Sequence, residues 1–324
     1  MRHLISLFDV SQQELQAILS LGEQVKSLLR TGRRPAWMPR SILALLFEKP
    51  SLRTRVSFEA GISQLGGTAM FLGQDVGWQN RESTADFVRV LAQYADYVVC
   101  RAKSHASVLE LASYNVVPII NGLTDVAHPC QALADLMTMR ATAGSLAGRT
   151  ITFVGDGNNV ARSLALACAM VGMRFRLLGP EEYFMPECAV EQISQRYPNA
   201  DIKMSGDART ALQDADFVYT DVWTSMGQEA ESAKRVKDFS PYQLNATMMG
   251  HASGNCKVLH CLPARRGEEI TDEVMDHPNS VVVEQAGNRM HAQKGLLIWL
   301  ALQHQQLTAA ELATEGVQLP PEIA

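Results

Sequence analysis

Ile42-Leu43-Ala44-Leu45-Leu46-Phe47, followed closely by Ser51-Leu52-Arg53-Thr54-Arg55, decides the fold class of this 324-residue chain. Six consecutive apolar residues predict a short strand that is buried on both faces, as in a parallel sheet. The spacing of Phe58, Ile62 and Leu65 then places three apolar side chains on one face of a helix. A buried strand that leads into a helix is the unit from which α/β folds are built.

The same alternation of short apolar runs with helical segments continues along the chain. We predict strands at residues 42–47, 69–72, 97–100, 117–120, 150–154, 175–178, 217–219, 257–260 and 280–283. We predict helices near the start, capped by Ser11, and at residues 54–65, 83–94, 160–171 and 288–304. Strands that alternate with helices predict parallel sheets, so the fold class is α/β.

The length of the chain suggests two ordinary domains. The small, turn-rich segment Ala143–Gly148 is the predicted boundary between them. We therefore expect one domain at residues 1–145 and a second at 146–304, followed by a polar tail at 305–324. Because chain ends that lack apolar residues are seldom fixed by packing, we expect the tail to be poorly ordered from Thr308 onward.

Composition excludes several classes of protein. Hydrophobic residues make up 47% and charged residues 19% of the chain, which is typical of a folded globular protein. A net charge of -5 argues against nucleic acid or an anionic membrane as the main partner. The first residues lack the apolar core of a signal peptide, and no apolar run is long enough to cross a bilayer. We expect a cytoplasmic protein.

Six cysteines occur, and none of them form a Cys-x-x-Cys pair. Most stand in apolar surroundings, which is typical of free thiols in a reducing compartment. His251, Cys256, His260 and Cys261 cluster loosely, but their spacing matches no standard zinc pattern. We therefore predict no bound metal and no cofactor.

Ser51-Leu52-Arg53-Thr54-Arg55 is the strongest candidate for a binding site. It follows a buried strand and opens a helix, where ligands bind in α/β sheets and where backbone N–H groups favour an anion. Arginine in the first turn of a helix opposes the helix dipole, so an ordinary solvated surface explains this segment poorly. Guanidinium and hydroxyl donors together suit a phosphate group.

Three further segments carry polar side chains at predicted strand ends or helix starts. In His128-Pro129-Cys130-Gln131 the histidine and glutamine could donate to a carbonyl or phosphoryl oxygen, unless the histidine is an ordinary core residue. The segment from Asp221 to Gln228 could bind a substrate amine and its carboxylate, or be a plain loop. In His260-Cys261-Leu262-Pro263 the thiol could be a nucleophile, an orienting group or a buried cysteine.

Gly155-Asp156-Gly157-Asn158-Asn159-Val160 is similar to the dinucleotide-binding pattern G-x-G-x-x-G. Val160 replaces the third glycine, and no acidic residue ends the following strand. The pattern is therefore weak evidence for an NAD-dependent dehydrogenase. The two asparagines at a helix start could instead bind a carboxylate.

Taken together and in order, these segments resemble the aspartate/ornithine carbamoyltransferase family. Ser-x-Arg-Thr-Arg and His-Pro-Cys-Gln resemble the family's carbamoyl phosphate motifs, and Asp-Val-Trp-Thr-Ser-Met-Gly-Gln-Glu and His-Cys-Leu-Pro look like its ornithine branch. The resemblance implies two parallel-sheet α/β domains with an active-site cleft between them, and a last helix at 288–304 that returns to the first domain. It also implies a homotrimer or a multiple of trimers.

The resemblance also implies the roles of individual residues. Carbamoyl phosphate would contact Ser51, Leu52, Arg53, Thr54, Arg101, His128, Gln131, Cys261, Leu262 and Arg289. Ornithine would contact Asn159, Asp221, Ser225 and Met226. The catalytic residues would be Arg53, Arg101, His128 and Cys261. The chain departs from the family's pattern at Leu52, where threonine is usual, and at Gly77, where many members have glutamine.

The implied reaction is carbamoyl phosphate plus L-ornithine giving L-citrulline plus phosphate. Cationic Arg53, Arg55 and Arg101 would favour the neutral form of the attacking amine. Cys261 would orient the amine, with no need for a covalent intermediate. N-acetylornithine, N-succinylornithine or putrescine as the acceptor, and a non-catalytic binding protein on the same fold, are the remaining alternatives.

Overall fold

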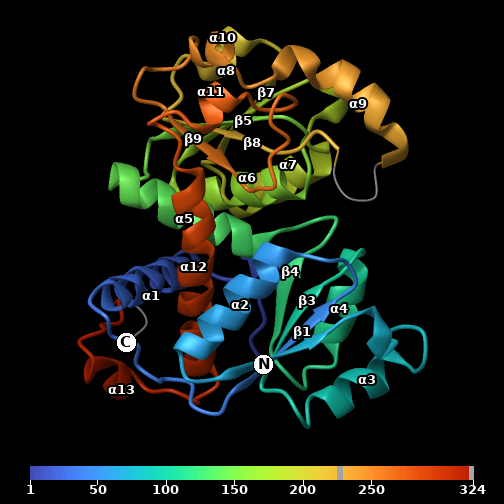
Figure 1. Cartoon of the computed structure of the whole chain (residues 1–324), viewed down its shortest axis with the longest axis vertical. Coiled ribbons are helices and arrows are strands. Elements are labelled where there is room, and N and C mark those ends of the chain that lie inside the picture. Colours follow the sequence, from blue (N-terminus) through green and yellow to red (C-terminus); the bar gives the residue numbers. More distant parts are fainter. Residues whose placement is uncertain (225–228, 321–324) are drawn as a thin grey trace. The chain divides into compact units, whose positions relative to one another are not determined.

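The computed structural model describes residues 1–224 and 229–320, and it contains two compact units (Figure 1). Unit 1 comprises Met1–Met137 together with Asn288–Ala324, and unit 2 comprises Thr138–Gly287. Each unit contains one sheet in which every strand pair is parallel. The predicted fold class, two parallel-sheet α/β domains, is confirmed, whereas the cleft between the domains stays a prediction.

The sheet of unit 1 has the strand order β2-β1-β3-β4. Its strands are β1 (Ile42–Phe47), β2 (Thr68–Leu72), β3 (Tyr97–Arg101) and β4 (Ile119–Leu123). The two central strands are almost wholly buried, which explains why their sequences are continuous apolar runs without alternation. Leu43 pairs with Tyr97, and Phe47 pairs with Arg101, so both strands end at the same edge of the sheet.

The helices of this unit include those predicted near the start of the chain and at residues 54–65, 83–94 and 288–304, although their bounds differ by a few residues. Unit 1 contains α1 (Gln12–Arg30), α2 (Leu52–Gln64), α3 (Thr84–Leu91), α4 (His105–Ser113), the start of α5 (Pro129–Ala143), most of α12 (Val282–Gln303) and α13 (Ala309–Ala313). Ser11 caps α1 and forms a reciprocal capping box with Glu14, as its position before the apolar periodicity predicts.

The sheet of unit 2 has the strand order β7-β6-β5-β8-β9. Its strands are β5 (Thr150–Val154), β6 (Arg174–Leu178), β7 (Asp201–Ser205), β8 (Phe217–Thr220) and β9 (Lys257–His260). Its helices are α6 (Asn159–Val171), α7 (Glu187–Arg196), α8 (Ala208–Leu212), α9 (Ser232–Phe239), α10 (Ala246–Met249) and α11 (Asp272–Met275). β5 and β8 are buried along their whole length and form the centre of the sheet.

Two predictions about local structure are wrong. Residues 280–283 do not form a strand, because Ser280 makes only an isolated bridge to Val258 and α12 begins at Val282. An apolar run this short does not distinguish a strand from the first turn of a helix. The tail is also ordered as far as residue 320. Thr308 caps α13, and the side chains of Leu312 and Val317 are buried.

Across the described part of the chain, no helix combines the length and the apolar character that crossing a bilayer requires.

Candidate active site

Unit 1 gathers the predicted phosphate-binding residues at the carboxyl edge of its sheet. In the strand order β2-β1-β3-β4, the chain passes from β1 to β2 in one direction across the sheet and from β3 to β4 in the opposite direction, so β1 and β3 form the topological switch point. β1 leads to Ser51 and Arg53 at the start of α2, and β3 ends at Arg101 itself. The topology therefore places both segments where a ligand binds in an α/β fold.

No described side chain caps the backbone N–H groups at the start of α2, so they can donate to a bound ligand. Ser51 occupies the N-cap position, but its hydroxyl donates to Thr54 Oγ1 (3.0 Å) and caps no backbone N–H group. Thr54 is fully buried and also accepts a bond from Arg289 Nη2 of α12 (2.9 Å). Helix N–H groups that lack a side-chain cap favour an anion, and a guanidinium group stands beside them.

Arg101 completes a cluster of cations. Burial, followed by the neighbouring guanidinium groups of Arg289 and Arg53, lowers the pKa of Arg101 to about 10. Its Nε atom is buried and has no hydrogen-bond partner within residues 1–224 and 229–320. Three guanidinium groups brought together in this way repel one another, and an anion between them would relieve that repulsion.

His128 and Gln131 stand at the start of α5, where Pro129 is the first helical residue. Burial, together with the charges of Arg289 and Arg101, lowers the pKa of His128 well below its ordinary value, so the imidazole is neutral. Gln131 Nε2 donates to Asp135 Oδ1 (2.8 Å), whereas the buried Oε1 accepts no bond from any described residue. A neutral imidazole and an open amide oxygen suit a ligand with both a carbonyl and an NH₂ group.

Two residues of the Ser-Leu-Arg-Thr-Arg segment point elsewhere. Arg55 pairs with Glu59 (2.9 Å) and lies over the ring of Phe71, and its side chain is 46% exposed. The expectation that Arg55 adds charge near the attacking amine is therefore not supported. The side chain of Leu52 is also exposed, so any phosphate contact there would come from its backbone.

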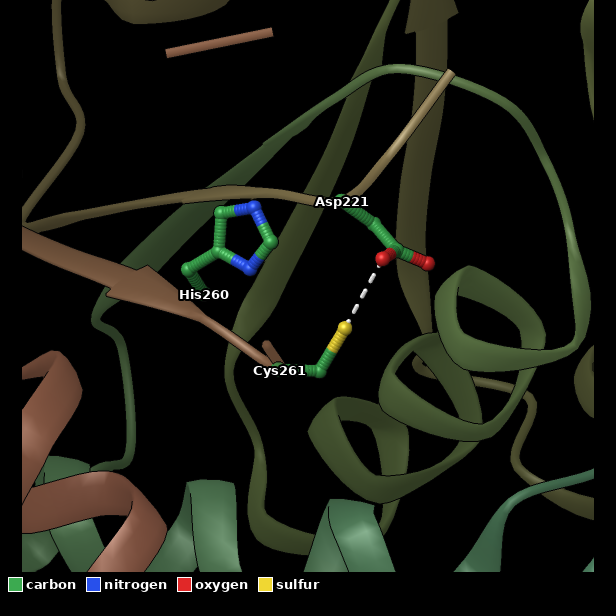
Figure 2. A group of neighbouring side chains, drawn as sticks. All are labelled: Asp221, His260 and Cys261. Carbon is green, nitrogen blue, oxygen red and sulfur yellow. Dashed lines mark hydrogen bonds between the residues drawn. The ribbon is translucent and has the colours of Figure 1, made fainter. Parts of the chain in front are cut away.

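In unit 2 the switch point lies between β5 and β8, which lead to Asn158 and Asp221 respectively. Asp221 is buried and accepts bonds from Asn158 Nδ2 (3.1 Å), the backbone N–H of Val222 (2.8 Å) and the thiol of Cys261 (2.9 Å). Figure 2 shows the sulfur of Cys261 directed at the carboxylate of Asp221. This arrangement fixes the direction of the half-buried thiol, whereas the expected role of Cys261 in orienting the substrate amine stays a prediction.

His260 belongs to a hydrogen-bonded group and not to a metal site. Asp221, His260 and Cys261 each offer one possible ligand atom, namely a carboxylate oxygen, a ring nitrogen and the sulfur. These three atoms lie within 4.8 Å of one another, which is close enough for a shared ion. However, His260 Nδ1 accepts from the N–H of Leu262 (2.8 Å), and Nε2 contacts Glu269 Oε1 (3.0 Å). Both ring nitrogens are thus engaged, which leaves the imidazole without a free ligand atom.

The remaining predicted ornithine residues give a mixed result. Asn159 is the first residue of α6, and its side chain accepts from the N–H of Val160 (3.0 Å). Ser225 and Met226 lie outside the described residues. Asn158 both caps α6 and binds the carboxylate of Asp221, and Glu269 contacts His260; the sequence alone names neither partner. A polar residue at a helix N-cap was the one available signal for Asn158.

Packing explains the dinucleotide-like glycines. A Cβ atom at Gly157 would lie 2.3 Å from the backbone nitrogen of Met185, and the N–H of Gly157 donates to Tyr183 O (2.8 Å). Gly179 is similarly close to the carbonyl oxygen of Gly155. The close contact at Gly157 and the positive φ of +146° at Gly155 account for both glycines of the motif without a bound dinucleotide.

All six cysteines are free thiols, as predicted. Cys188 is exposed and Cys261 is half-buried, whereas the other four are buried. Burial raises the pKa of Cys130 and Cys256 to about 12, and it raises the pKa of Cys100 well above its ordinary value. Position and exposure thus set Cys261 apart as the accessible thiol beside functional groups.

Comparisons with known proteins agree with this geometry. The family model for the carbamoyl-P binding domain of aspartate/ornithine carbamoyltransferase matches residues 2–141, and the model for its Asp/Orn binding domain matches residues 147–300. The ornithine carbamoyltransferase of Anoxybacillus flavithermus is 45% identical over 92% of this chain and 96% of its own length. An anabolic ornithine carbamoyltransferase of Pyrococcus furiosus is 44% identical over 91% of this chain and 95% of its own length.

Solved structures give the same result. The ornithine carbamoyltransferase from Pyrococcus furiosus superposes with a TM-score of 0.89 at 44% identity, covering 92% of this chain and 96% of that one. The enzyme from Thermus thermophilus superposes with a TM-score of 0.83 at 37% identity, covering 93% and 99%. With both domain models matched, and with relatives of this identity aligned over nearly their whole length, the chain belongs to the aspartate/ornithine carbamoyltransferase family.

Proposed function

We propose that this protein is a carbamoyltransferase that converts carbamoyl phosphate and L-ornithine to L-citrulline and phosphate. The observation that carries the proposal is the cluster of Arg53, Arg101 and Arg289 beside the uncapped start of α2. Family membership and the names of the relatives support the same reaction. A role in arginine metabolism follows from the product.

Carbamoyl phosphate would bind to unit 1. Its phosphate would accept bonds from the backbone at Leu52 and from Ser51, Arg53 and Thr54, and Arg289 would add a guanidinium group. The carbamoyl group would lie against Arg101, His128 and Gln131. The free Oε1 atom of Gln131 would accept a bond from the carbamoyl NH₂ group.

Ornithine would bind to unit 2 through Asn159, Asp221, Ser225 and Met226. Cys261 and Leu262 would contact both substrates. The carboxylate of Asp221, to which the thiol of Cys261 and the amide of Asn158 already donate, would accept a hydrogen bond from the substrate amine and help to orient it. Residues 1–145 would thus form the carbamoyl phosphate domain and residues 146–304 the ornithine domain.

The chemical step needs the side-chain amine of ornithine in its neutral form. A free alkylamine has a pKa of about 10.4, and cations nearby lower it. Arg53 and Arg101 would act in this way, while Cys261 would orient the nitrogen lone pair. The amine nitrogen forms a bond to the carbonyl carbon, and the bond from that carbon to the phosphate oxygen breaks.

Arg53, Arg101 and neutral His128 would stabilise the negative charge that develops on the carbonyl oxygen. Because a hydrogen bond from a neutral imidazole needs no proton transfer, His128 donates without changing its charge. The departing phosphate takes up the amine proton, so the step needs no protein base. No metal or cofactor enters this scheme.

Assembly and location complete the proposal. We propose a homotrimer or a multiple of trimers in the cytoplasm. Sedimentation velocity on the purified protein measures the assembly directly, and a monomer at micromolar concentration would contradict it.

Citrulline formation with carbamoyl phosphate is the deciding experiment. L-ornithine, N-acetylornithine, N-succinylornithine, putrescine and aspartate are compared in parallel as acceptors. We expect turnover with L-ornithine. Turnover only with another amine would retain the carbamoyl phosphate site and refute the acceptor, whereas no turnover with any amine would refute the proposal.

A further inference from the structure

Arg235 is a buried arginine of α9 that the proposed reaction does not use. Its side chain is only 4% exposed, although it carries a permanent charge. Nη2 makes a close ion pair with Asp156 Oδ2, and Nε donates to the backbone carbonyl of Trp223 (2.5 Å). A third contact, from Nη1 to the exposed Glu231, is longer at 3.7 Å. Burying an ion pair is costly, so its presence here calls for an explanation.

The two strong partners of Arg235 lie next to the acceptor residues in the sequence. Asp156 precedes Asn158 by two residues, and Trp223 follows Asp221 by two residues. Asn158 Nδ2 in turn donates to Asp221 Oδ2 (3.1 Å). The chain segments 156–158 and 221–223 are therefore joined at both ends, by Arg235 at one end and by the Asn158–Asp221 bond at the other.

Aromatic rings fix the guanidinium group of Arg235 in place. Its central carbon lies 4.7 Å from the centre of the Tyr183 ring and 5.5 Å from that of Phe239. The rings of Tyr183 and Phe239 are themselves in contact at 4.6 Å, and Phe239 stacks on Trp223 at 6.3 Å. A planar guanidinium group packed in this way has one orientation, from which it binds both segments at once.

We infer that Arg235 is a positioning residue for the proposed acceptor site: by joining Asp156 to the carbonyl of Trp223, it fixes Asp221 in the orientation that receives the substrate amine. The inference rests on the proposed function. It also explains the Gly155-Asp156-Gly157 motif, whose acid serves as the partner of Arg235. Asp221 contacts Cys261 directly, so the same junction determines where the thiol points.

Electrostatics support the pairing. Burial raises the pKa of Asp156 above its ordinary value, and Arg235 is the main group that opposes this effect. Without Arg235 the carboxylate would be buried without its strongest partner, and it would be expected to shift or to take up a proton. Either event would move the segment that leads to Asn158.

The test compares Arg235→Met with Asp156→Asn, using initial rates of citrulline formation. We expect Arg235→Met to raise the KM for ornithine about tenfold or more, because a loss of about 1.4 kcal/mol in binding corresponds to that factor. The affinity for carbamoyl phosphate, measured by calorimetry, should change less than about twofold, since the phosphate and most of the other proposed contacts lie on unit 1. Arg235→Lys should fall between the wild type and Arg235→Met, because an ammonium group lacks the planar fork.

Arg176→Met is the matched control. Arg176 is an arginine of the same unit that pairs bidentately with Asp201 (2.8 Å for each bond) and, among the described residues, makes no hydrogen bond to segment 156–158 or segment 221–223, so it joins β6 to β7 only. We expect this variant to lower the melting temperature while leaving the KM for ornithine unchanged. If Arg235→Met lost stability but kept the wild-type KM, its role would be merely structural and the inference would be wrong.

The outcomes also separate this inference from the proposed function. A wild-type protein that forms no citrulline overturns both. A wild-type protein that forms citrulline, together with an Asp156→Asn variant of unchanged KM, overturns the inference alone. Asp156→Asn preserves the shape of the side chain, so it provides the test even if Arg235→Met does not fold.

Discussion

Replacing Arg101 by methionine is expected to weaken ligand binding while stabilising the unliganded protein. Arg101 is buried beside Arg289 and Arg53, and these surroundings lower its pKa from its ordinary value to about 10. That difference corresponds to an unfavourable free energy of about 3 kcal/mol in the absence of an anion, reduced by solvent screening to about 1–2 kcal/mol. Methionine has a similar length and carries no charge, so the variant loses this cost.

The expected changes are opposite in sign and measurable. Without ligand, the melting temperature should rise by about 2–8 °C, given about 2–4 °C per kcal/mol for a unit of this size. Carbamoyl phosphate should bind about 10- to 150-fold more weakly, because charge-assisted hydrogen bonds contribute about 1.5–3 kcal/mol. Differential scanning calorimetry measures the first change, and titration calorimetry with freshly dissolved carbamoyl phosphate measures the second.

Arg55→Met serves as the control for this pair of measurements. Arg55 belongs to the same segment, but it pairs with Glu59 at the surface, where such pairs contribute about 0–1 kcal/mol. The affinity of the Arg55→Met variant for carbamoyl phosphate should remain within about twofold of that of the wild type. If Arg101→Met melted at a lower temperature and bound carbamoyl phosphate as tightly as the wild type, the cluster would not be an anion site.

Three further predictions follow from the site and its surroundings. Cys261→Ser should reduce kcat about tenfold or more with little effect on the affinity for carbamoyl phosphate. The serine hydroxyl would still donate to Asp221, but it would orient the substrate amine less well than the thiol does. Full turnover of this variant in the citrulline assay would disprove the orienting role. Burial lowers the pKa of His291 to about 3, so below pH about 6.5 the unfolded state binds a proton that the folded state does not, and stability should fall as the pH is lowered from about 6.5 towards 3. In His291→Asn, the free energy of unfolding measured in urea should depend less steeply on pH between 7 and 5, by up to about 1.4 kcal/mol per pH unit. An unchanged pH dependence would contradict this prediction. Dialysis against EDTA should leave the citrulline rate unchanged, because both nitrogens of His260 are engaged; a loss that zinc restores would contradict this prediction.

The features that the sequence predicted well are those set by local pattern. β1 was predictable because six apolar residues in succession suit a strand buried on both faces, and α2 follows it as the apolar spacing predicts, whereas the anion site at the start of α2 stays a prediction. β7 was missed because it lies at an edge of the sheet, where Asp201–Ser205 is only partly buried and its residues are mostly polar.

Contacts between distant parts of the chain could not be predicted in this way. Cys261 and Asp221 are separated by 40 residues, and only the order of β8 and β9 in the sheet brings their side chains together. Arg55 shows the converse case, since its spacing beside Arg53 suggested a shared role that the direction of its side chain does not support. The identity of a residue indicates what it can bind, but the surrounding packing decides what it reaches.

The unequal exposure of the six cysteines has a practical consequence. Cys188 is the exposed cysteine, and Cys261 is the half-buried one. In a Cys188→Ser background, a maleimide dye or a fluorine probe would therefore label Cys261 selectively, since the other four thiols are inaccessible. The protein thus contains a natural attachment point for a spectroscopic reporter beside Asp221, through which the arrival of an amine could be followed in real time without any turnover.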